Sequence, residues 1–244
     1  MKAFIFASGL GTRMRPLTHH RPKPLLPVAG TPLIAWHLYK LATIGVHEVI
    51  INISWLAGAF AQTLADGQTF GVRISYIDEG PTPLETGGGL LNARAKLGAS
   101  PFLVINGDIW TDYDFSRLPS QPKDLAHLVL VNPPPYAPLG DWGLRRDGLI
   151  ALDATPQLTY AGIGVYDPRL LDFWQDAFAH QKATVSWVDG KPQFRLAPLL
   201  KYLIQAGRIH GEHYRGRWAD VGTPERLAAL DQELRSAGIC AGEQ

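Results

Sequence analysis

Residues 4–24 read FIFASGLGTRMRPLTHHRPKP, and the rest of the chain can be interpreted from this stretch. The apolar residues 2–7 predict a short buried strand, and residues 8–11 predict a turn of small residues directly after it. Such a turn lets backbone N–H groups approach an anion closely. Arg13 and Lys23 add two fixed cations in the same stretch. The stretch therefore predicts a phosphate-binding turn.

Two better-known glycine patterns do not fit. A dinucleotide-binding fingerprint needs a third glycine where the chain has Met14, and an acidic residue near the end of the next strand, which reads VIINIS over residues 49–54. A Walker A loop needs Lys followed by Ser or Thr, whereas Lys191 is followed by Pro192. A lone G-x-G favours a plain strand-to-loop turn. The longer pattern here favours a nucleoside triphosphate as the bound anion.

Five strings of sequence resemble the signature of the sugar-1-phosphate nucleotidyltransferases. They are GLGTRMRPLT at residues 9–18, RPKPLLPV at 21–28, ETGGG at 85–89, NGD at 106–108 and WADVGT at 218–223. The resemblance covers nearly the whole chain. It implies an α/β fold, Rossmann-like, with a mostly parallel mixed sheet flanked by helices, of the nucleotide-diphospho-sugar transferase type. The chain is most similar to the branch of the family that uses N-acetylmuramic acid 1-phosphate and UTP in peptidoglycan recycling of the bacterial cell wall.

The length of 244 residues favours one α/β domain. We expect a nucleotidyltransferase domain over residues 1–236, followed by a tail over residues 237–244. Within it, residues 1–110 are expected to form a nucleotide-binding half and residues 111–236 a sugar-binding half.

The composition limits the partners. A net charge of +1 gives no electrostatic argument for nucleic acid or membrane surfaces as partners. The single cysteine, Cys240, fits a reducing compartment, and no apolar run approaches the roughly 18 residues of a membrane span. We therefore expect a cytoplasmic protein with small-molecule substrates, as a monomer or weak oligomer.

Strand and helix signals alternate over residues 2–105. The expected strands cover residues 2–7, 49–53, 72–77 and 102–105, and the expected helices cover residues 31–45, 56–64 and 88–97. Thr31 is expected to cap the first helix, with Pro32 at its first position and Gly45 at its end. This order predicts a mostly parallel sheet, covered on both faces, with ligands at the carboxyl ends of the strands.

In the second part of the chain, the predicted strands and helices no longer alternate regularly. The expected strands cover residues 127–132, 159–166, 209–214 and 217–219, with a hairpin around residues 147–148. The expected helices cover residues 169–179 and 196–206, and a final helix is expected to be capped by Thr223.

Asp108 and Asp220 are the candidate metal ligands. An Asp in N-G-D more often forms a turn, and Asp220 in W-A-D-V-G-T is as readily a loop residue or a helix cap. Beside a triphosphate, Mg²⁺ takes one or two carboxylates plus phosphate oxygens. The family resemblance implies that these two positions bind Mg²⁺, and that Arg13, Lys23 and Asp108 are the catalytic residues.

The nucleotide is expected to contact the glycine turn and the ETGGG string. The three glycines of that string alone favour a flexible loop entering a helix, but their place at a strand end favours contact with the base. The expected nucleotide-binding residues are Gly9, Leu10, Gly11, Thr12, Arg13, Lys23, Glu85, Thr86, Gly87, Gly88 and Asp108.

The sequence gives weaker signals for the residues that bind the sugar phosphate. Gly140, Asp141 and Trp142 stand where relatives use a Lys after a Glu to contact the sugar. The expected substrate-binding residues are Asn106, Gly140, Asp141, Gly162, Arg195 and Asp220.

The resemblance implies a Mg²⁺-dependent transfer that converts UTP and N-acetylmuramic acid 1-phosphate to UDP-N-acetylmuramic acid and pyrophosphate. Two alternatives stay open. One is the same chemistry on glucose, mannose or N-acetylglucosamine 1-phosphate with UTP, dTTP or GTP. The other is a non-catalytic nucleotide-sugar sensor.

Overall fold

The structure is a computed structural model and describes residues 1–179 and 184–242. Its contacts divide the chain into two compact units that alternate along the sequence. Unit 1 consists of Met1, Leu84–Val104 and Arg117–Gly216, and unit 2 consists of Lys2–Pro83, Ile105–Ser116 and Arg217–Gln244. Unit 2 thus combines the beginning of the chain, a short central segment and the C-terminal segment.

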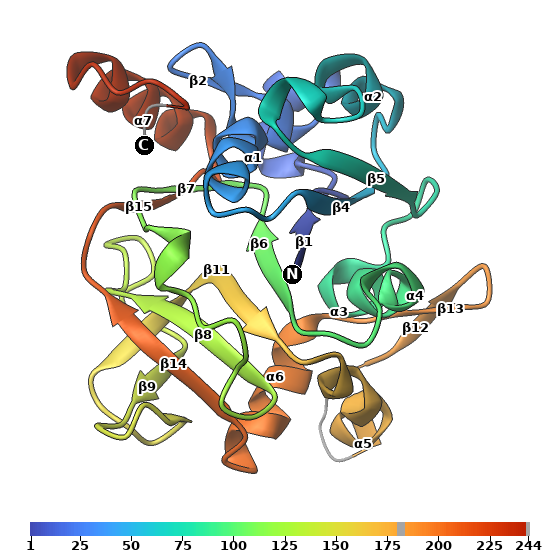
Figure 1. Cartoon of the computed structure of the whole chain (residues 1–244), viewed down its shortest axis with the longest axis vertical. Helices are drawn as coiled ribbons and strands as arrows, with labels where there is room; N and C mark the ends of the chain where they lie inside the picture. The colour runs from blue at the N-terminus through green and yellow to red at the C-terminus, as the bar shows by residue number, and fades with distance from the viewer. Residues whose placement is uncertain (180–183, 243–244) are drawn as a thin grey trace. The chain divides into compact units, whose positions relative to one another are not determined.

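Three parallel strands form the sheet of unit 2 (Figure 1). They are β1 (Lys2–Phe6), β4 (Glu48–Ile53) and β5 (Arg73–Asp78), with β4 paired to both of the others. Helix α1 (Leu33–Thr43) connects β1 to β4, and helix α2 (Gly58–Leu64) connects β4 to β5. The predicted parallel pairing of these strands is confirmed.

Burial explains why β1 and β4 are almost wholly apolar. Phe4 and Ile5 point to opposite faces of the sheet and both are fully buried, and the same holds for Ile50 and Ile51, at most 3% exposed. A strand that is covered on both faces needs a continuous apolar run, as the sequence provides.

The rest of unit 2 contains two short antiparallel ladders and a long helix. The ladders pair β2 (Pro27–Val28) with β3 (Thr31–Pro32) and β7 (Ile109–Thr111) with β15 (Trp218–Asp220), and the helix is α7 (Pro224–Ser236). The short 3-10 turns are η1 (Thr12–Met14), η2 (Leu17–His19), η3 (Lys23–Leu25) and η4 (Gln68–Phe70). Thr223 caps α7, as predicted, because its hydroxyl accepts a hydrogen bond from the Arg226 N–H at 3.4 Å.

Five strands of unit 1 pair with one another in the series β14-β8-β11-β9-β10. The strands are β8 (Ala126–Val131), β9 (Trp142–Leu144), β10 (Ile150–Ala151), β11 (Gln157–Tyr166) and β14 (Ile209–Tyr214). Only the β14–β8 pair is parallel. The predicted hairpin around residues 147–148 is confirmed, because β9 and β10 flank it as an antiparallel pair.

The remaining elements of unit 1 are mostly helical. The helices are α3 (Glu85–Asn92), α4 (Arg94–Leu97), α5 (Trp174–Ala179) and α6 (Leu196–Gln205), together with a 3-10 segment η6 (Pro168–Phe173) and a hairpin of β12 (Ser186–Val188) and β13 (Lys191–Gln193). Strand β6 (Phe102–Asn106) begins in unit 1, and its last two residues belong to unit 2. Segment η5 (Phe115–Arg117) also runs across a unit boundary.

Several predicted helix boundaries are wrong. Thr31 does not cap α1, because it pairs with Val28 in the β2–β3 ladder and the helix begins at Leu33. Helix α2 begins at Gly58, since Leu56 has a positive φ of 52°. The helix expected over residues 88–97 begins at Glu85 and breaks after Asn92, and the one expected over residues 169–179 starts as a 3-10 segment.

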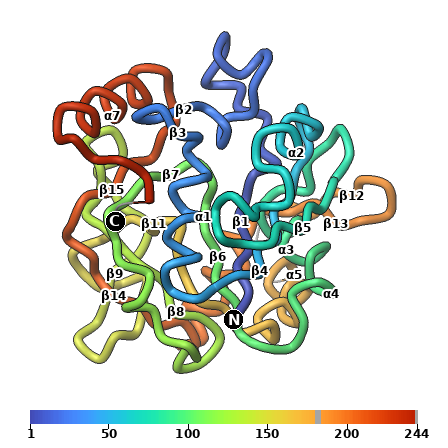
Figure 2. Tube along the Cα trace, turned by 45° about the horizontal axis from the view of Figure 1, so that its top comes forward, coloured from blue at the N-terminus to red at the C-terminus, as the bar shows by residue number. Residues whose placement is uncertain are grey.

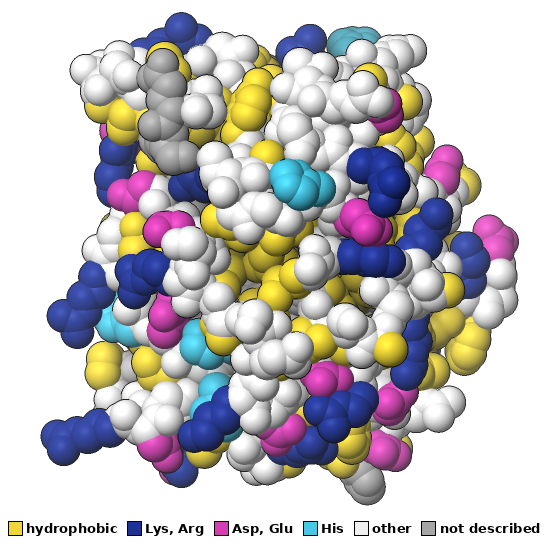
Figure 3. Space-filling view, in the orientation of Figure 1, with side chains coloured by type: hydrophobic (Ala, Val, Ile, Leu, Met, Phe, Trp, Pro, Cys, Tyr) yellow, Lys and Arg dark blue, Asp and Glu magenta, His cyan; other side chains and the backbone are white. Residues whose placement is uncertain are grey.

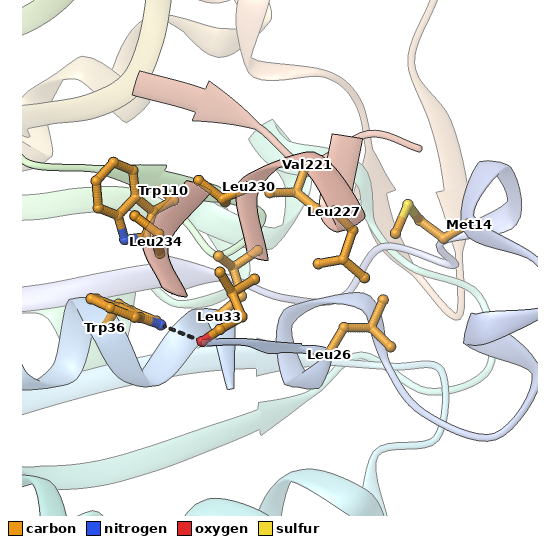
Figure 4. Close-up of a cluster of buried hydrophobic side chains, with 10 residues drawn as sticks. Met14, Leu26, Leu33, Trp36, Trp110, Val221, Leu227, Leu230 and Leu234 are labelled. Carbon is orange, nitrogen blue, oxygen red and sulfur yellow. Dashed lines mark hydrogen bonds between the residues drawn. The ribbon is translucent and has the colours of Figure 1, made fainter. Parts of the chain in front are cut away.

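A buried apolar cluster joins distant segments of unit 2 (Figure 4). Met14 comes from the turn after β1, Trp110 from β7, Val221 from the residue after β15, and Leu227 and Leu234 from α7. All five are at most 8% exposed. The cluster therefore holds the beginning and the end of the chain against each other.

Two further observations concern the surface. On the face drawn in Figure 3, Lys and Arg side chains are interspersed with Asp and Glu side chains. Among residues 1–179 and 184–242, none of the helices combines the length and the apolar character that a membrane span needs.

Candidate active site

The glycine turn, which comprises residues 8–18, follows β1 and forms a loop of its own, drawn in blue at the top of Figure 2. Gly11 has a φ of +62°, and a Cβ atom there would lie 2.9 Å from Cγ2 of Thr18. The Thr18 hydroxyl donates a hydrogen bond to the Gly11 carbonyl at 2.8 Å, and the Met14 N–H donates to the same oxygen at 2.9 Å. Only glycine fits this position, and the loop closes tightly around it.

The loop lies in a segment without acidic side chains. Residues 1–47 contain six Lys and Arg residues and no Asp or Glu. Arg13, Arg15 and Arg21 are exposed, and none of the three forms an ion pair within the described part of the chain. Uncompensated guanidinium groups beside a small-residue turn create a local site for a polyanion.

Lys23 and Asp108 form an ion pair next to this turn. The Lys23 Nζ donates to the Asp108 Oδ2 at 2.6 Å, and the two side chains are 10% and 37% exposed. Lys23 also packs close to the turn, since a Cβ built on Gly11 would lie 3.4 Å from its Cβ. The ammonium group is thus held in one place between the turn and the carboxylate.

Gly107 explains how Asp108 reaches this place. The Gly107 N–H donates to the Phe6 carbonyl at the end of β1, at 2.9 Å. A Cβ atom on Gly107 would lie 2.6 Å from that oxygen and 3.2 Å from Cγ2 of Ile5, so no side chain fits. The small residue lets the chain after β6 pass against the end of β1 and bring Asp108 beside the turn.

Asp220 reaches the same region from the C-terminal part of the chain. In the β15–β7 ladder it pairs with Ile109, and the Val221 N–H donates to the Asp108 carbonyl at 3.0 Å. Asp108, the residue before β7, and Asp220, the last residue of β15, therefore lie next to each other. The Asp220 Oδ2 accepts a hydrogen bond from the Arg226 guanidinium of α7 at 2.7 Å, which fixes the carboxylate.

Two buried basic residues of α1 hold β7, and the sequence analysis did not assign them. The His37 Nε2 lies 3.0 Å from the Ile109 carbonyl, which can only accept, so this nitrogen carries the proton. The Lys40 Nζ donates to the Thr111 carbonyl at 2.6 Å. Burial, with a smaller contribution from Lys40, lowers the pKa of His37 to about 4, and burial lowers the pKa of Lys40 to about 8. The sequence signal for these two residues was their position, three residues apart, on one face of an otherwise apolar helix.

The ETGGG string in unit 1 forms the first part of α3. The N–H groups of Gly87 and Gly88 both donate to the Phe194 carbonyl, at 2.9 and 3.1 Å. A Cβ on Gly87 would lie 2.3 Å from the Phe194 ring, and one on Gly88 would lie 2.3 Å from the Pro192 carbonyl. These glycines permit close packing, and their two N–H groups, which we expected to be available to a base, are bonded to the Phe194 carbonyl. Their contact with a base stays a prediction.

The expected sugar-binding residues of unit 1 have structural partners. Arg195 and Glu85 form an ion pair at 3.6 Å. The Asp141 Oδ2 accepts a hydrogen bond from the Tyr160 N–H at 2.8 Å, so this carboxylate joins the segment before β9 to β11. Gly140 and Gly162 have positive φ values of 67° and 76°. Their role in sugar binding stays a prediction.

The predicted site residues therefore fall into two groups. Those in unit 2 are Gly9, Leu10, Gly11, Thr12, Arg13, Lys23, Asn106, Asp108 and Asp220. Those in unit 1 are Glu85, Thr86, Gly87, Gly88, Gly140, Asp141, Gly162 and Arg195. The three residues predicted to be catalytic and both predicted metal ligands lie in the same unit.

Known proteins resemble the chain over almost its full length. Two relatives are named N-acetylmuramate alpha-1-phosphate uridylyltransferase: one from Neisseria meningitidis is 41% identical over 93% of this chain and 95% of its own, and one from Caulobacter vibrioides is 32% identical over 96% and 97%. A solved Bacillus anthracis structure, assigned as a glucose-1-phosphate thymidylyltransferase in complex with sucrose, matches with a TM-score of 0.80 at 22% identity over 96% of this chain and 95% of that one.

The structural likeness confirms the predicted fold class, an α/β fold with a mostly parallel mixed sheet flanked by helices. The family model described as nucleotidyl transferase matches residues 2–237. The chain therefore belongs to the nucleotidyl transferase family, among the sugar-1-phosphate nucleotidyltransferases that its motifs resemble.

Proposed function

We propose that this enzyme transfers a uridylyl group from UTP to N-acetylmuramic acid 1-phosphate. The observation that carries the proposal is the Lys23–Asp108 ion pair beside the glycine turn that carries Arg13, with Asp220 next to Asp108. The choice of substrates is supported by the names of the two relatives that are 41% and 32% identical to the chain.

In this reaction, a phosphate oxygen of the sugar 1-phosphate attacks the α-phosphorus of UTP. The bond from the α-phosphorus to the bridging oxygen of the β-phosphate breaks, and pyrophosphate leaves with both electrons of that bond. The attacking group is already an anion near neutral pH, so no general base is required. The enzyme has to position two anions that repel each other and neutralise the charge on the leaving group.

The residues of unit 2 suit these tasks. The exposed Arg13, without an ion-pair partner among the described residues, is free to bind the β- and γ-phosphates. The Lys23 ammonium is oriented by Asp108, so it can donate to the α-phosphate with little reorganisation. The small-residue turn adds backbone N–H groups between these two cations.

The carboxylates of Asp108 and Asp220 suit a magnesium ion that would be coordinated by the protein and by the phosphate oxygens of the substrate. Mg²⁺ is usually bound by one or two carboxylates plus phosphate oxygens, and these two residues lie next to each other at the end of the β7–β15 ladder. Among the described residues, no group of three or more His, Cys, Asp or Glu side chains forms a complete metal site. When bound, Mg²⁺ would neutralise charge on the phosphates.

Two alternatives make different predictions. The same chemistry on another sugar 1-phosphate, or with dTTP or GTP, would use the same unit 2 residues. A non-catalytic sensor would be expected to have lost Arg13, Lys23 or Asp108, and all three are present. The proposed substrates also place the enzyme in the cytoplasm, where UTP is available, and in peptidoglycan recycling.

The test is an assay of pyrophosphate release with four nucleoside triphosphates against several sugar 1-phosphates. We expect the highest kcat/KM with UTP and N-acetylmuramic acid 1-phosphate, in the presence of Mg²⁺. A higher kcat/KM with another pair would replace the proposed substrates. Nucleotide binding in calorimetry without turnover on any sugar phosphate would favour the sensor.

A further inference from the structure

We propose that the carboxyl end of β4 clamps both ends of the glycine turn, with Asn52 and Trp55 as positioning residues for the nucleotide phosphates. The inference rests on the proposed function of the turn as the phosphate site. Its structural part concerns residues 52–55, the glycine turn with the preceding Ala7, and Glu79, all within unit 2.

Asn52 holds the beginning of the turn. Its Oδ1 accepts a hydrogen bond from the Ala7 N–H at 2.9 Å, and its Nδ2 donates to the Ser8 hydroxyl at 2.9 Å. The same Nδ2 donates to the Glu79 Oε1 at 2.7 Å, which fixes the amide from the side of β5. The Asn52 amide thus connects the ends of three parallel strands.

Asn52 is fully buried and stands in the otherwise apolar string VIINI of β4. A buried amide is costly unless it is hydrogen-bonded, and an apolar side chain would pack in this strand without that requirement. Its bonds go to Ala7 and Ser8, directly before Gly9. We infer that the amide is present because it orients the start of the turn.

Trp55 holds the far end of the turn. Its indole N–H donates to the Thr18 carbonyl at 3.0 Å, although Trp55 is 38% exposed. Thr18 is 1% exposed, and its hydroxyl donates to the Gly11 carbonyl at 2.8 Å. Trp55, Thr18 and Gly11 therefore form a chain of hydrogen bonds from β4 to the middle of the turn.

The consequence is a phosphate site that is ordered before the nucleotide arrives. A loop that is fixed in advance loses little conformational entropy on binding, whereas a loosened loop must be ordered by its ligand. Weakening the clamp should therefore reduce the affinity for the nucleotide. The affinity for the sugar 1-phosphate should change little, because the residues expected to bind it lie outside this loop and mostly in unit 1.

The experiment compares Thr18→Val, which removes the hydroxyl at constant shape, with Thr18→Ser, which keeps it. Trp55→Phe removes the indole N–H and keeps an aromatic ring. For Thr18→Val and Trp55→Phe we expect the KM for UTP and its calorimetric Kd to rise about five- to tenfold, the effect of one lost hydrogen bond. The KM for the sugar 1-phosphate should change less than about twofold, and Thr18→Ser should restore the nucleotide KM.

A matched control is Trp187→Phe, at a position that is 64% exposed in the β12–β13 hairpin. This variant should keep both KM values. A purely structural role would lower the active fraction, so kcat would fall with both KM values unchanged. That result, or an unchanged KM and Kd for UTP in Thr18→Val and Trp55→Phe, would overturn the inference.

Hydrogen exchange separates the failure of this inference from the failure of the proposed function. Without any nucleotide, the amides of residues 7–19 should exchange faster in Thr18→Val and Trp55→Phe than in the wild type, while β5 and α1 stay unchanged. Equal exchange rates would refute the clamp. A wild type that turns over no substrate pair would instead refute the proposed function, and the exchange result would still decide on the clamp.

Discussion

Among single residues, the two proposed cations of the site, Arg13 and Lys23, are held in different ways. Lys23 is nearly buried and held by Asp108, so its position is set by the fold. Arg13 is exposed and has no ion-pair partner among the described residues. We therefore expect Arg13 to contribute little to the stability of the folded chain, and its proposed role is to bind the phosphates.

Substitution of Arg13 tests this distinction. We expect Arg13→Gln to lower kcat by about 10²–10³, the usual effect of removing one donor to a developing charge, and to leave the free energy of unfolding within about 0.5 kcal/mol. Arg146→Gln, at an exposed position in the β9–β10 hairpin, is the control and should keep wild-type kcat. A kcat for Arg13→Gln within about threefold of the wild type would exclude its proposed role.

Gly107 packs against the end of β1 and also sets the position of Asp108. Gly107→Ala would place a Cβ atom 2.6 Å from the Phe6 carbonyl, a backbone atom that cannot move aside cheaply. We expect a loss of about 1–3 kcal/mol in urea unfolding and a lower kcat, because Asp108 would be displaced. Gly58→Ala has open space around it and should be neutral in both measurements. A Gly107→Ala protein with the free energy of unfolding of the wild type would show that the backbone moves to relieve the contact with the Phe6 carbonyl.

Among the elements, α1 and β7 are joined by buried basic groups. His37 is neutral in the folded state because its pKa is about 4 instead of 6.5. Between these two pH values the unfolded chain binds more protons than the folded chain. The free energy of unfolding should therefore fall as the pH decreases from 6.5 to 4, by about 3 kcal/mol from this residue.

The variant His37→Gln isolates this effect, since an amide can still donate to the Ile109 carbonyl but does not titrate. Urea unfolding between pH 4 and 7 should show a flatter pH dependence for His37→Gln than for the wild type. His47→Gln, at an exposed position, should keep the wild-type slope. The same slope in all three proteins would argue against a buried neutral histidine.

The elements also show what the sequence can predict. The strands β1, β4 and β5 were predicted because their apolar runs and intervening helices are local signals. Strand β7 was missed, because its three residues become a strand only through pairing with β15, about a hundred residues away. The start of α3 was missed because glycines have low helix propensity, which packing on Phe194 overrides here.

The candidate site was predictable to a similar extent. Arg13, Lys23, Asp108 and Asp220 were proposed from motifs, since their chemistry is visible in the residue types, and the structure has all four in unit 2. His37, Lys40 and Asn52 were not assigned, because a buried polar residue acquires its role from tertiary partners. The single Asn in the apolar run of β4 was the strongest unused signal.

For the molecule as a whole, the apolar core of unit 2 brings the site together. Met14, Trp110 and Val221 come from the three segments that carry Arg13, Asp108 and Asp220, and all three contribute to one cluster with α7 (Figure 4). We therefore expect the C-terminal helix to support the proposed site, which begins near residue 9. Loss of its apolar face should affect stability and activity together.

Leu234→Ala tests this coupling. Leu234 is fully buried in the cluster, so its truncation should cost about 2–5 kcal/mol in urea unfolding and lower the thermal midpoint of activity in parallel. Ala229→Ser, on the exposed face of the same helix, should change neither quantity. A destabilised Leu234→Ala protein with an unchanged thermal midpoint of activity would show that the site does not depend on this cluster.

The proposed sharing of Mg²⁺ by Asp108 and Asp220 can be tested by pyrophosphate release from UTP and N-acetylmuramic acid 1-phosphate as a function of Mg²⁺ concentration. Asp108→Asn keeps the shape of the side chain and removes its charge. We expect this variant to fold like the wild type and to lose at least about 10²–10³ in kcat at every Mg²⁺ concentration. Turnover by folded Asp108→Asn at the wild-type rate, with the wild-type Mg²⁺ dependence, would contradict the proposed site.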